Sequence, residues 1–110
     1  MPHFGGKDLF EVQILIPMAD NAGQIFTEPH HASFEAFVVA LFGGVTRLPN
    51  EATGAWADAG VVYRDQTRIY VVALRSIVNG GKVGELATFA KAHYAQLAVY
   101  VRYLTLAEVL

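Results

Sequence analysis

The sequence predicts an α+β protein built in the order strand, helix, strand, strand, helix, strand. Apolar side chains alternate along residues 10–18, which is the period of a β-strand. Residues 30–42 and 82–93 instead carry apolar side chains three and four positions apart, the period of a helix. Between them, residues 54–75 are typical of a hairpin. This order predicts a ferredoxin-like fold, with a four-stranded antiparallel sheet and two helices on one face.

The first strand, residues 10–18, has two unlike sides, because successive side chains of a strand point in opposite directions. One side is entirely apolar and consists of Phe10, Val12, Ile14 and Ile16. The other side is mixed and consists of Glu11, Gln13 and Leu15. Pro17 ends the strand, since proline has no N–H to donate to a neighbouring strand.

The first helix has a start signal and a stop signal in the sequence. Thr27 can cap its N-terminus, and Pro29 is tolerated in the first turn. Gly43 and Gly44 end it, because glycine adopts the left-handed conformation of a helix end readily. The apolar stripe of this helix is Phe34, Phe37, Val38 and Leu41. The second helix carries the stripe Val83, Leu86, Ala87, Ala90 and Tyr94.

The remaining strands are interrupted by turn formers. Residues 45–48 form a short strand that Pro49 and its neighbour break. Residues 57–60 form the turn of the hairpin, and residues 64–67 are a bulge or a second turn before the strand at 68–74.

The C-terminal strand is placed at residues 97–103, because the helical period gives way to alternation there. No glycine or proline separates this strand from the second helix. Residues 105–110 are expected to be a tail.

Helices can cover only one face of such a sheet. Alternation in the two later strands assigns to the helix side Ile69, Val71, Ala73, Leu97, Val99 and Val101. The open face then receives Glu11, Gln13, Leu15, Arg68, Tyr70, Val72, Leu74, Ala98, Tyr100 and Arg102. This set is too apolar for open water, so we expect the open face to pack against a second copy or to line a cavity between copies.

The composition supports self-association. Hydrophobic residues make up 54% of the 110 residues and charged residues 16%, against about 25% charged residues in a typical domain. We therefore expect one domain, residues 1–110, that forms a homo-oligomer, a homodimer or a higher assembly.

Charge and hydropathy exclude several classes of partner. A net charge of −2 offers no attraction for nucleic acid or an anionic membrane. The longest apolar run, residues 37–45, is far below the ~20 residues of a membrane-spanning helix. No signal peptide is recognisable and there are 0 cysteines, so we expect a cytoplasmic protein without disulfides.

The histidines are the only acid–base candidates near neutral pH. His30 and His31 open the first helix, and Glu35 shares a helix face with His31. Two ligands do not make a metal site, so we expect a solvated helix start and no bound metal. At the end of the second helix we expect Tyr94 in the core and His93 at its edge, the alternative being an acid or base that faces a cleft.

The predicted function is the binding of a small organic ligand at the open sheet face or between subunits, near the loops around residues 20–27 and Trp56. The candidate ligand-binding residues are Gln13, Trp56, Arg68, Tyr70, Tyr100 and Arg102. The sequence assigns no catalytic residue and indicates no cofactor. One alternative is a small dimeric α+β barrel-type enzyme that uses histidine acid–base chemistry, and a second is a purely structural interaction module.

Residues 34–74 contain the runs FEAFVVALFGGVT, GAW and VVYRDQTRIYVVAL. In this pattern the chain resembles small bacterial proteins of unknown function with ferredoxin-like folds. The resemblance implies the fold and carries over no catalytic residue.

Overall fold

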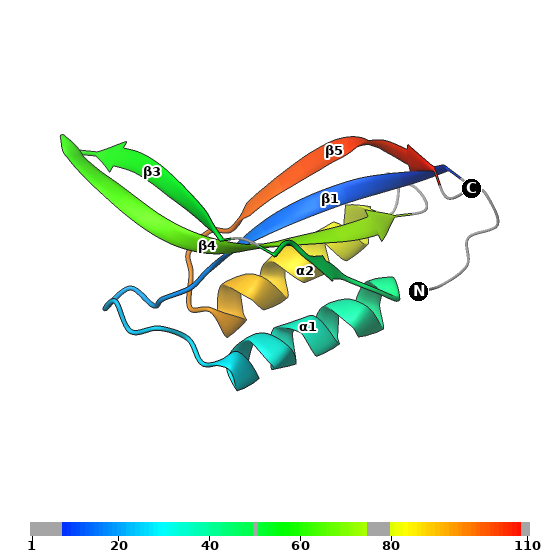
Figure 1. Ribbon diagram of the computed structural model, residues 1–110, viewed down its shortest axis with the longest axis horizontal. Coiled ribbons are helices and arrows are strands. Elements are labelled where there is room, and N and C mark those ends of the chain that lie inside the picture. Colours follow the sequence, from blue (N-terminus) through cyan, green and yellow to red (C-terminus); the bar gives the residue numbers. More distant parts are fainter. Residues whose placement is uncertain (1–7, 50, 75–79, 109–110) are drawn as a thin grey trace.

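The structure is a computed structural model, and it describes residues 8–49, 51–74 and 80–108. The elements follow in the order β1 (Asp8–Pro17), α1 (Glu28–Phe42), β2 (Thr46–Arg47), β3 (Ala52–Asp58), β4 (Val61–Leu74), α2 (Gly80–His93) and β5 (Tyr100–Glu108). Both helices lie on the same side of the sheet (Figure 1). This is the predicted α+β, ferredoxin-like arrangement.

The described sheet has five strands rather than the predicted four. Its order is β2-β4-β1-β5, with β3 also paired to β4, and every pairing is antiparallel. β2 pairs with Tyr70 and Val71, whereas β3 pairs with residues 61–67 of the same strand. The second strand of the fold is therefore divided, because Pro49 lies between its two parts and cannot continue a ladder.

The strand β4 runs through residues 64–67 without a break, so the bulge or turn predicted there is wrong. The hairpin turn is at Ala59 and Gly60, whose φ angles are both positive, at 52° and 79°. Such a two-residue turn matches the right-handed twist of the flanking strands. The last contact of β4 on the β1 side is at Gln66, whose carbonyl accepts from the Met18 N–H at 3.0 Å. Residues 61–65 of β4 pair with β3 alone, and we call residues 53–65 the hairpin arm. The arm projects past the end of the sheet (Figure 1).

The register of β1 against β4 corrects the predicted faces of β4. Ile14 is directly opposite Tyr70, and Ile16 is opposite Arg68. Directly opposite residues share a face, so Arg68, Tyr70, Val72 and Leu74 lie under the helices and are buried. Ile69, Val71 and Ala73 are on the open face instead. Both rows of β4 are largely apolar, so alternation alone could not identify the buried row.

The helix stripes form the rest of the core, as predicted for Phe34, Val38, Val83, Leu86, Ala90 and Tyr94. His31 is also fully buried, with 0% exposure, so the predicted solvated helix start is wrong for this residue. His31 precedes Phe34 by three positions and Val38 by seven, which places it on the same helix face.

The cap that follows α2 contains a left-handed residue that is not glycine. Ala95 has a φ of 52°, and the N–H of Gln96 donates to the carbonyl of Lys91 at 2.8 Å. This is the hydrogen-bonding pattern of a Schellman cap. Leu97 follows with full exposure, and β5 begins only at Tyr100. The predicted C-terminal strand is present, but it runs from Tyr100 to Glu108 rather than over 97–103. The helix-side position of Leu97 and the tail from residue 105 are therefore wrong.

Candidate functional site

The six candidate ligand-binding residues divide between two faces of the sheet and the hairpin arm. Gln13, Tyr100 and Arg102 lie on the open face, as predicted. Arg68 and Tyr70 lie on the helix side, so the expectation that they share a surface with Gln13 is wrong. Trp56 lies in the arm opposite Tyr63, and its side chain is outside the part of the chain that the structure describes.

On the open face, β1 brings polar and aliphatic side chains together. Gln13 is opposite Arg102 in β5 and opposite Val71 in β4. Leu15 is likewise opposite Tyr100 on one side and Ile69 on the other. The aliphatic residues here are half-buried, and Tyr100 and Arg102 are exposed. We call this surface the open-face strip. Its apolar part consists of Leu15, Ile69 and Val71, and its polar flank consists of Gln13, Tyr100 and Arg102.

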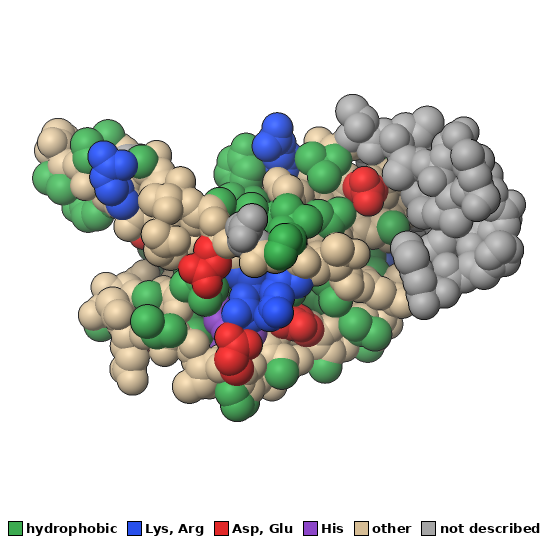
Figure 2. All heavy atoms as spheres, in the orientation of Figure 1, with side chains coloured by type: hydrophobic (Ala, Val, Ile, Leu, Met, Phe, Trp, Pro, Cys, Tyr) green, Lys and Arg blue, Asp and Glu red, His purple; other side chains and the backbone are tan. Residues whose placement is uncertain are grey.

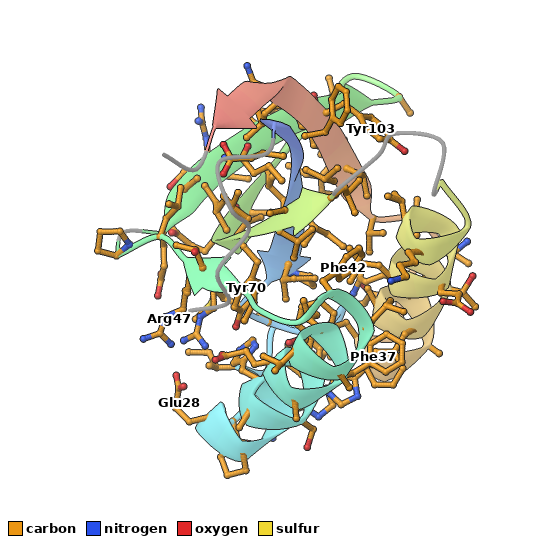
Figure 3. The ribbon with its side chains drawn as sticks, turned by 90° about the vertical axis from the view of Figure 1, so that its right-hand side faces the viewer. Glu28, Phe37, Phe42, Arg47, Tyr70 and Tyr103 are labelled. Carbon is orange, nitrogen blue, oxygen red and sulfur yellow. The ribbon has the colours of Figure 1, made fainter. Side chains whose placement is uncertain are left out.

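A second group of polar residues, which the sequence did not reveal, lies between α1 and the helix side of the sheet. We call it the helix-side cluster, and it consists of Glu28, His31, Glu35, Arg68, Tyr70 and Tyr94. Figure 2 shows basic side chains flanked by acidic ones over this junction. Figure 3 shows Glu28, Arg47 and Tyr70 on the same side of the molecule, between α1 and the sheet.

Arg68 is the centre of the helix-side cluster. Its guanidinium donates to Glu28 at 2.7 Å from Nη2 and at 3.4 Å from Nη1. Nη1 also lies 3.8 Å from Glu35 Oε2, and that same oxygen accepts a hydrogen bond from the Tyr70 hydroxyl at 2.6 Å. A buried guanidinium held by two carboxylates satisfies the rule that buried charges are paired.

The spacing on α1 explains how these groups meet. Glu28, His31 and Glu35 are separated by three and four positions, so they share one helix face. Because Arg68 contacts both glutamates, its guanidinium lies over the turn that carries His31. This spacing is visible in the sequence, but the partner Arg68 is 40 positions from Glu28, and only the strand register brings it there.

His31 is the least satisfied group in the cluster. Its Nδ1 lies 2.7 Å from the Tyr94 hydroxyl, whereas its buried Nε2 has no hydrogen-bond partner. If the phenol donates to Nδ1, the proton is on Nε2 and one donor is unpaired. If Nδ1–H donates instead, both the phenol proton and the Nε2 lone pair are unpaired. Counting partners therefore assigns the proton to Nε2.

Burial and charge fix the protonation states of the cluster near neutral pH. Burial lowers the pKa of His31, and the neighbouring Arg68 lowers it further, so the imidazole is neutral. Burial, followed by the hydrogen bond to Glu35, raises the pKa of Tyr70 to about 12, and burial also raises the pKa of Tyr94. The hydrogen bond to Arg68 lowers the pKa of Glu28, which stays charged.

His30 and His93 join the helix ends beside this cluster. The Nε2 of each histidine lies 2.7 Å from the backbone carbonyl of the other. Their rings stack with centroids 3.9 Å apart, and Phe26 stacks on the outer side of His30 at 4.9 Å. The predicted position of His93 at the edge of the core, with Tyr94 inside, is confirmed.

Neither a metal centre nor a membrane-spanning helix is found among the described residues. No group of three or more histidine, cysteine, aspartate or glutamate side chains there is arranged to hold a metal ion. Neither described helix is long and apolar enough to cross a membrane.

No protein family and no curated protein sequence matches this chain. Among solved structures, the divalent cation tolerance protein CutA1 from Thermus thermophilus is similar over 92% of this chain and 86% of its own, with 19% identity and a TM-score of 0.63. CutA1 from Oryza sativa is similar over 94% and 82%, with 12% identity and a TM-score of 0.63. A phage SAM lyase in complex with S-methyl-5'-thioadenosine is similar over 99% and 94%, with 11% identity and a TM-score of 0.67.

At these identities the similarity concerns the fold, since one fold supports many unrelated functions. It shows that the chain has the small ferredoxin-like α+β fold that the sequence pattern and the resemblance predicted.

Proposed function

We propose that this protein is a homo-oligomer that binds a small organic ligand between its copies, at the open-face strip. One observation carries the proposal. The helices of the chain leave an apolar surface of the sheet uncovered, and this surface has a polar flank at Gln13, Tyr100 and Arg102. Ligand pockets in proteins are mostly apolar and contain a few polar groups that orient the ligand. A second copy over this face would supply the missing wall.

The hairpin arm supports the self-association part of the proposal. Residues 61–66 are exposed throughout, although Val61 and Val62 in this stretch are apolar and are 50% and 60% exposed. A two-stranded ribbon without a third strand or a covering layer is marginally stable in water. A second copy packed on the arm would cover these valines.

The polar flank favours a ligand with hydrogen-bonding groups. Gln13 can donate and accept, Tyr100 can do both, and the guanidinium of Arg102 donates to anionic or carbonyl oxygens. The structural neighbours supply probes for this chemistry, because one was solved with S-methyl-5'-thioadenosine and others are named for divalent cation tolerance.

The proposal is tested by light scattering and calorimetric titration on the same samples. We expect a molar mass above that of the 12.0 kDa chain, and saturable binding of a nucleoside probe such as S-methyl-5'-thioadenosine. Arg102→Ala should weaken that binding at least tenfold, as expected for a lost hydrogen bond to a charged group. Lys82→Ala, an exposed cation on α2, is the control and should change nothing. A monomer that binds no nucleoside or divalent-cation probe would contradict the proposal.

The enzyme alternative stays a prediction, with less support from the described histidines. His31 uses Nδ1 to bind Tyr94, and His30 and His93 use Nε2 to bind backbone carbonyls. A general base needs a lone pair within reach of the proton that it removes. His31 does not offer one, because its Nδ1 is bound to Tyr94. Each of His30 and His93 keeps a lone pair on Nδ1 when its Nε2–H donates to the carbonyl, and an enzyme of this kind would use one of these. The structural-module alternative also stays a prediction, and a dimer whose open face binds no probe would favour it.

A further inference from the structure

We propose that the helix-side cluster is a binding site for the anionic end of a small molecule, a carboxylate or a phosphate, which Arg68 and the Nε2–H of His31 receive once Glu28 moves aside. This site is independent of the proposed function, because it lies on the opposite side of the sheet from the open-face strip.

His31 carries an unpaired hydrogen-bond donor. The Nε2 of His31 is buried and contacts no hydrogen-bond partner, and burying a donor without a hydrogen bond is costly. Such groups are rare in native proteins and call for an explanation, an absent ligand being one. A donor of this kind requires an acceptor, and an anionic oxygen is the strongest acceptor available to it.

Arg68 lies beside this donor. Its guanidinium lies over the helix turn that carries His31, since it contacts both Glu28 and Glu35 on that face. Two kinds of donor therefore lie at the same junction of α1 and β4. The planar fork of arginine suits a carboxylate or a phosphate, which it can bind through two parallel hydrogen bonds.

The carboxylate of Glu28 now occupies the guanidinium of Arg68. The side chain of Arg68 is 9% exposed, whereas that of Glu28 is 72% exposed. Glu28 therefore reaches in from solvent and can rotate away without disturbing the core. The carboxylate of Glu28 has the same geometry and charge as a ligand carboxylate, so it is a competitor that a ligand can displace.

The surrounding charges tolerate the exchange. Arg47 acts electrostatically on Glu28 and lies at the same edge of the molecule (Figure 3). Glu35 remains held by the hydroxyl of Tyr70. Once Glu28 has turned outward, the two cations Arg68 and Arg47 attract the incoming anion. Glu35 is the carboxylate that remains beside Arg68 and that the anion must lie near.

The test compares two glutamate variants in titrations with succinate and, separately, with inorganic phosphate. Binding is followed through the His31 ring nitrogens in long-range proton–nitrogen spectra. Glu28→Gln keeps the size of the side chain but removes the competing charge, so we expect it to tighten binding about fivefold, the upper range for an exposed ion pair. Glu85→Gln, an exposed glutamate on α2, is the matched control and should leave the affinity unchanged.

Two further readouts complete the test. The spectra of the free protein should show the His31 proton on Nε2, and the Nε2 resonance should shift on saturation. Arg68→Lys keeps the charge and loses the fork, so it should weaken binding about tenfold or more. If this variant does not fold, the comparison of the two glutamate variants decides alone. Equal affinities of Glu28→Gln and Glu85→Gln, or no saturable shift with either anion, would overturn the proposal.

Discussion

The buried hydrogen bond between His31 and Tyr94 leads to a quantitative prediction. Tyr94→Phe removes only the hydroxyl and keeps the ring contacts with Phe26 and Phe34, whose centroids lie 5.0 Å and 5.4 Å away. The change leaves both nitrogens of a fully buried imidazole without a partner. An unsatisfied buried polar group costs about 1–3 kcal/mol. We therefore expect the free energy of unfolding to fall by about 1–3 kcal/mol.

The assay is urea unfolding at pH 7.5 and one fixed protein concentration, because self-association would also change the apparent stability. In a thermal melt, each kcal/mol should lower Tm by about 4–8 °C for a chain of this size. Tyr103→Phe is the control, since Tyr103 is 55% exposed and is not part of the open-face strip, and it should change the stability by less than about 0.5 kcal/mol.

A double-mutant cycle with His31→Leu separates the hydrogen bond from other effects. In the leucine background the Tyr94 hydroxyl has lost its partner, so Tyr94→Phe should be neutral or stabilising. If Tyr94→Phe instead costs no more than Tyr103→Phe, or costs the same in both backgrounds, the reasoning about His31 is refuted.

Three further predictions concern a helix end, the hairpin arm and pH. Ala95→Gly should raise the free energy of unfolding in urea by up to about 1 kcal/mol. Glycine relieves ~1–2 kcal/mol of left-handed backbone strain, which exceeds the ~0.4–1 kcal/mol entropy cost of a more flexible unfolded chain. Ala92→Gly inside α2 is the control and should lower the free energy of unfolding by about 1 kcal/mol. Val62→Lys in the arm should lower the molar mass measured by light scattering, whereas Val39→Lys on α1 should leave it unchanged. Equal changes of molar mass in the two variants would contradict a role of the arm in assembly. Since burial lowers the folded-state pKa of His31 below its unfolded value of about 6.5, its stabilising contribution is complete above pH ~6.5 and is lost as the pH falls through the folded pKa. Urea unfolding should then show a slope of up to about 1.4 kcal/mol per pH unit, and a His31→Gln variant with an unchanged slope would contradict this.

The order of the elements could be predicted because each main segment has one clear period. Residues 10–18 alternate, and the stripes of α1 and α2 recur at three and four positions. The ends of α1 were also predictable, since Thr27 caps it and Gly43 ends it with a φ of 84°. By contrast, the left-handed residue that closes the end of α2 is Ala95, a residue type that gives no stop signal.

The buried row of β4 could not be predicted, because Tyr70 and Val72 are no more apolar than Ile69 and Val71 on the other row. Pairing with β1 decided between them. As a result Arg68 and Tyr70 belong to the helix-side cluster rather than to the open face. A pattern read within one strand does not contain the register between strands.

The burial of His31 could not be predicted for a related reason. Histidine is buried less often than apolar residues, and the apolar stripe of the helix begins at Phe34 when only apolar side chains are counted. Extending the stripe back by one turn reaches His31, so the helical period did contain the signal. Its partner Tyr94 is 63 positions away, and only tertiary packing could reveal the hydrogen bond.

Amide hydrogen exchange in the hairpin arm tests the central claim, self-association of this fold, most directly. Residues 61–65 are exposed and pair with β3 alone, so in an isolated chain their amides should exchange rapidly. In an oligomer that covers the arm and the open-face strip, these amides should be protected, and their protection should grow with protein concentration. Fast exchange that does not change between low and high protein concentration would contradict the account.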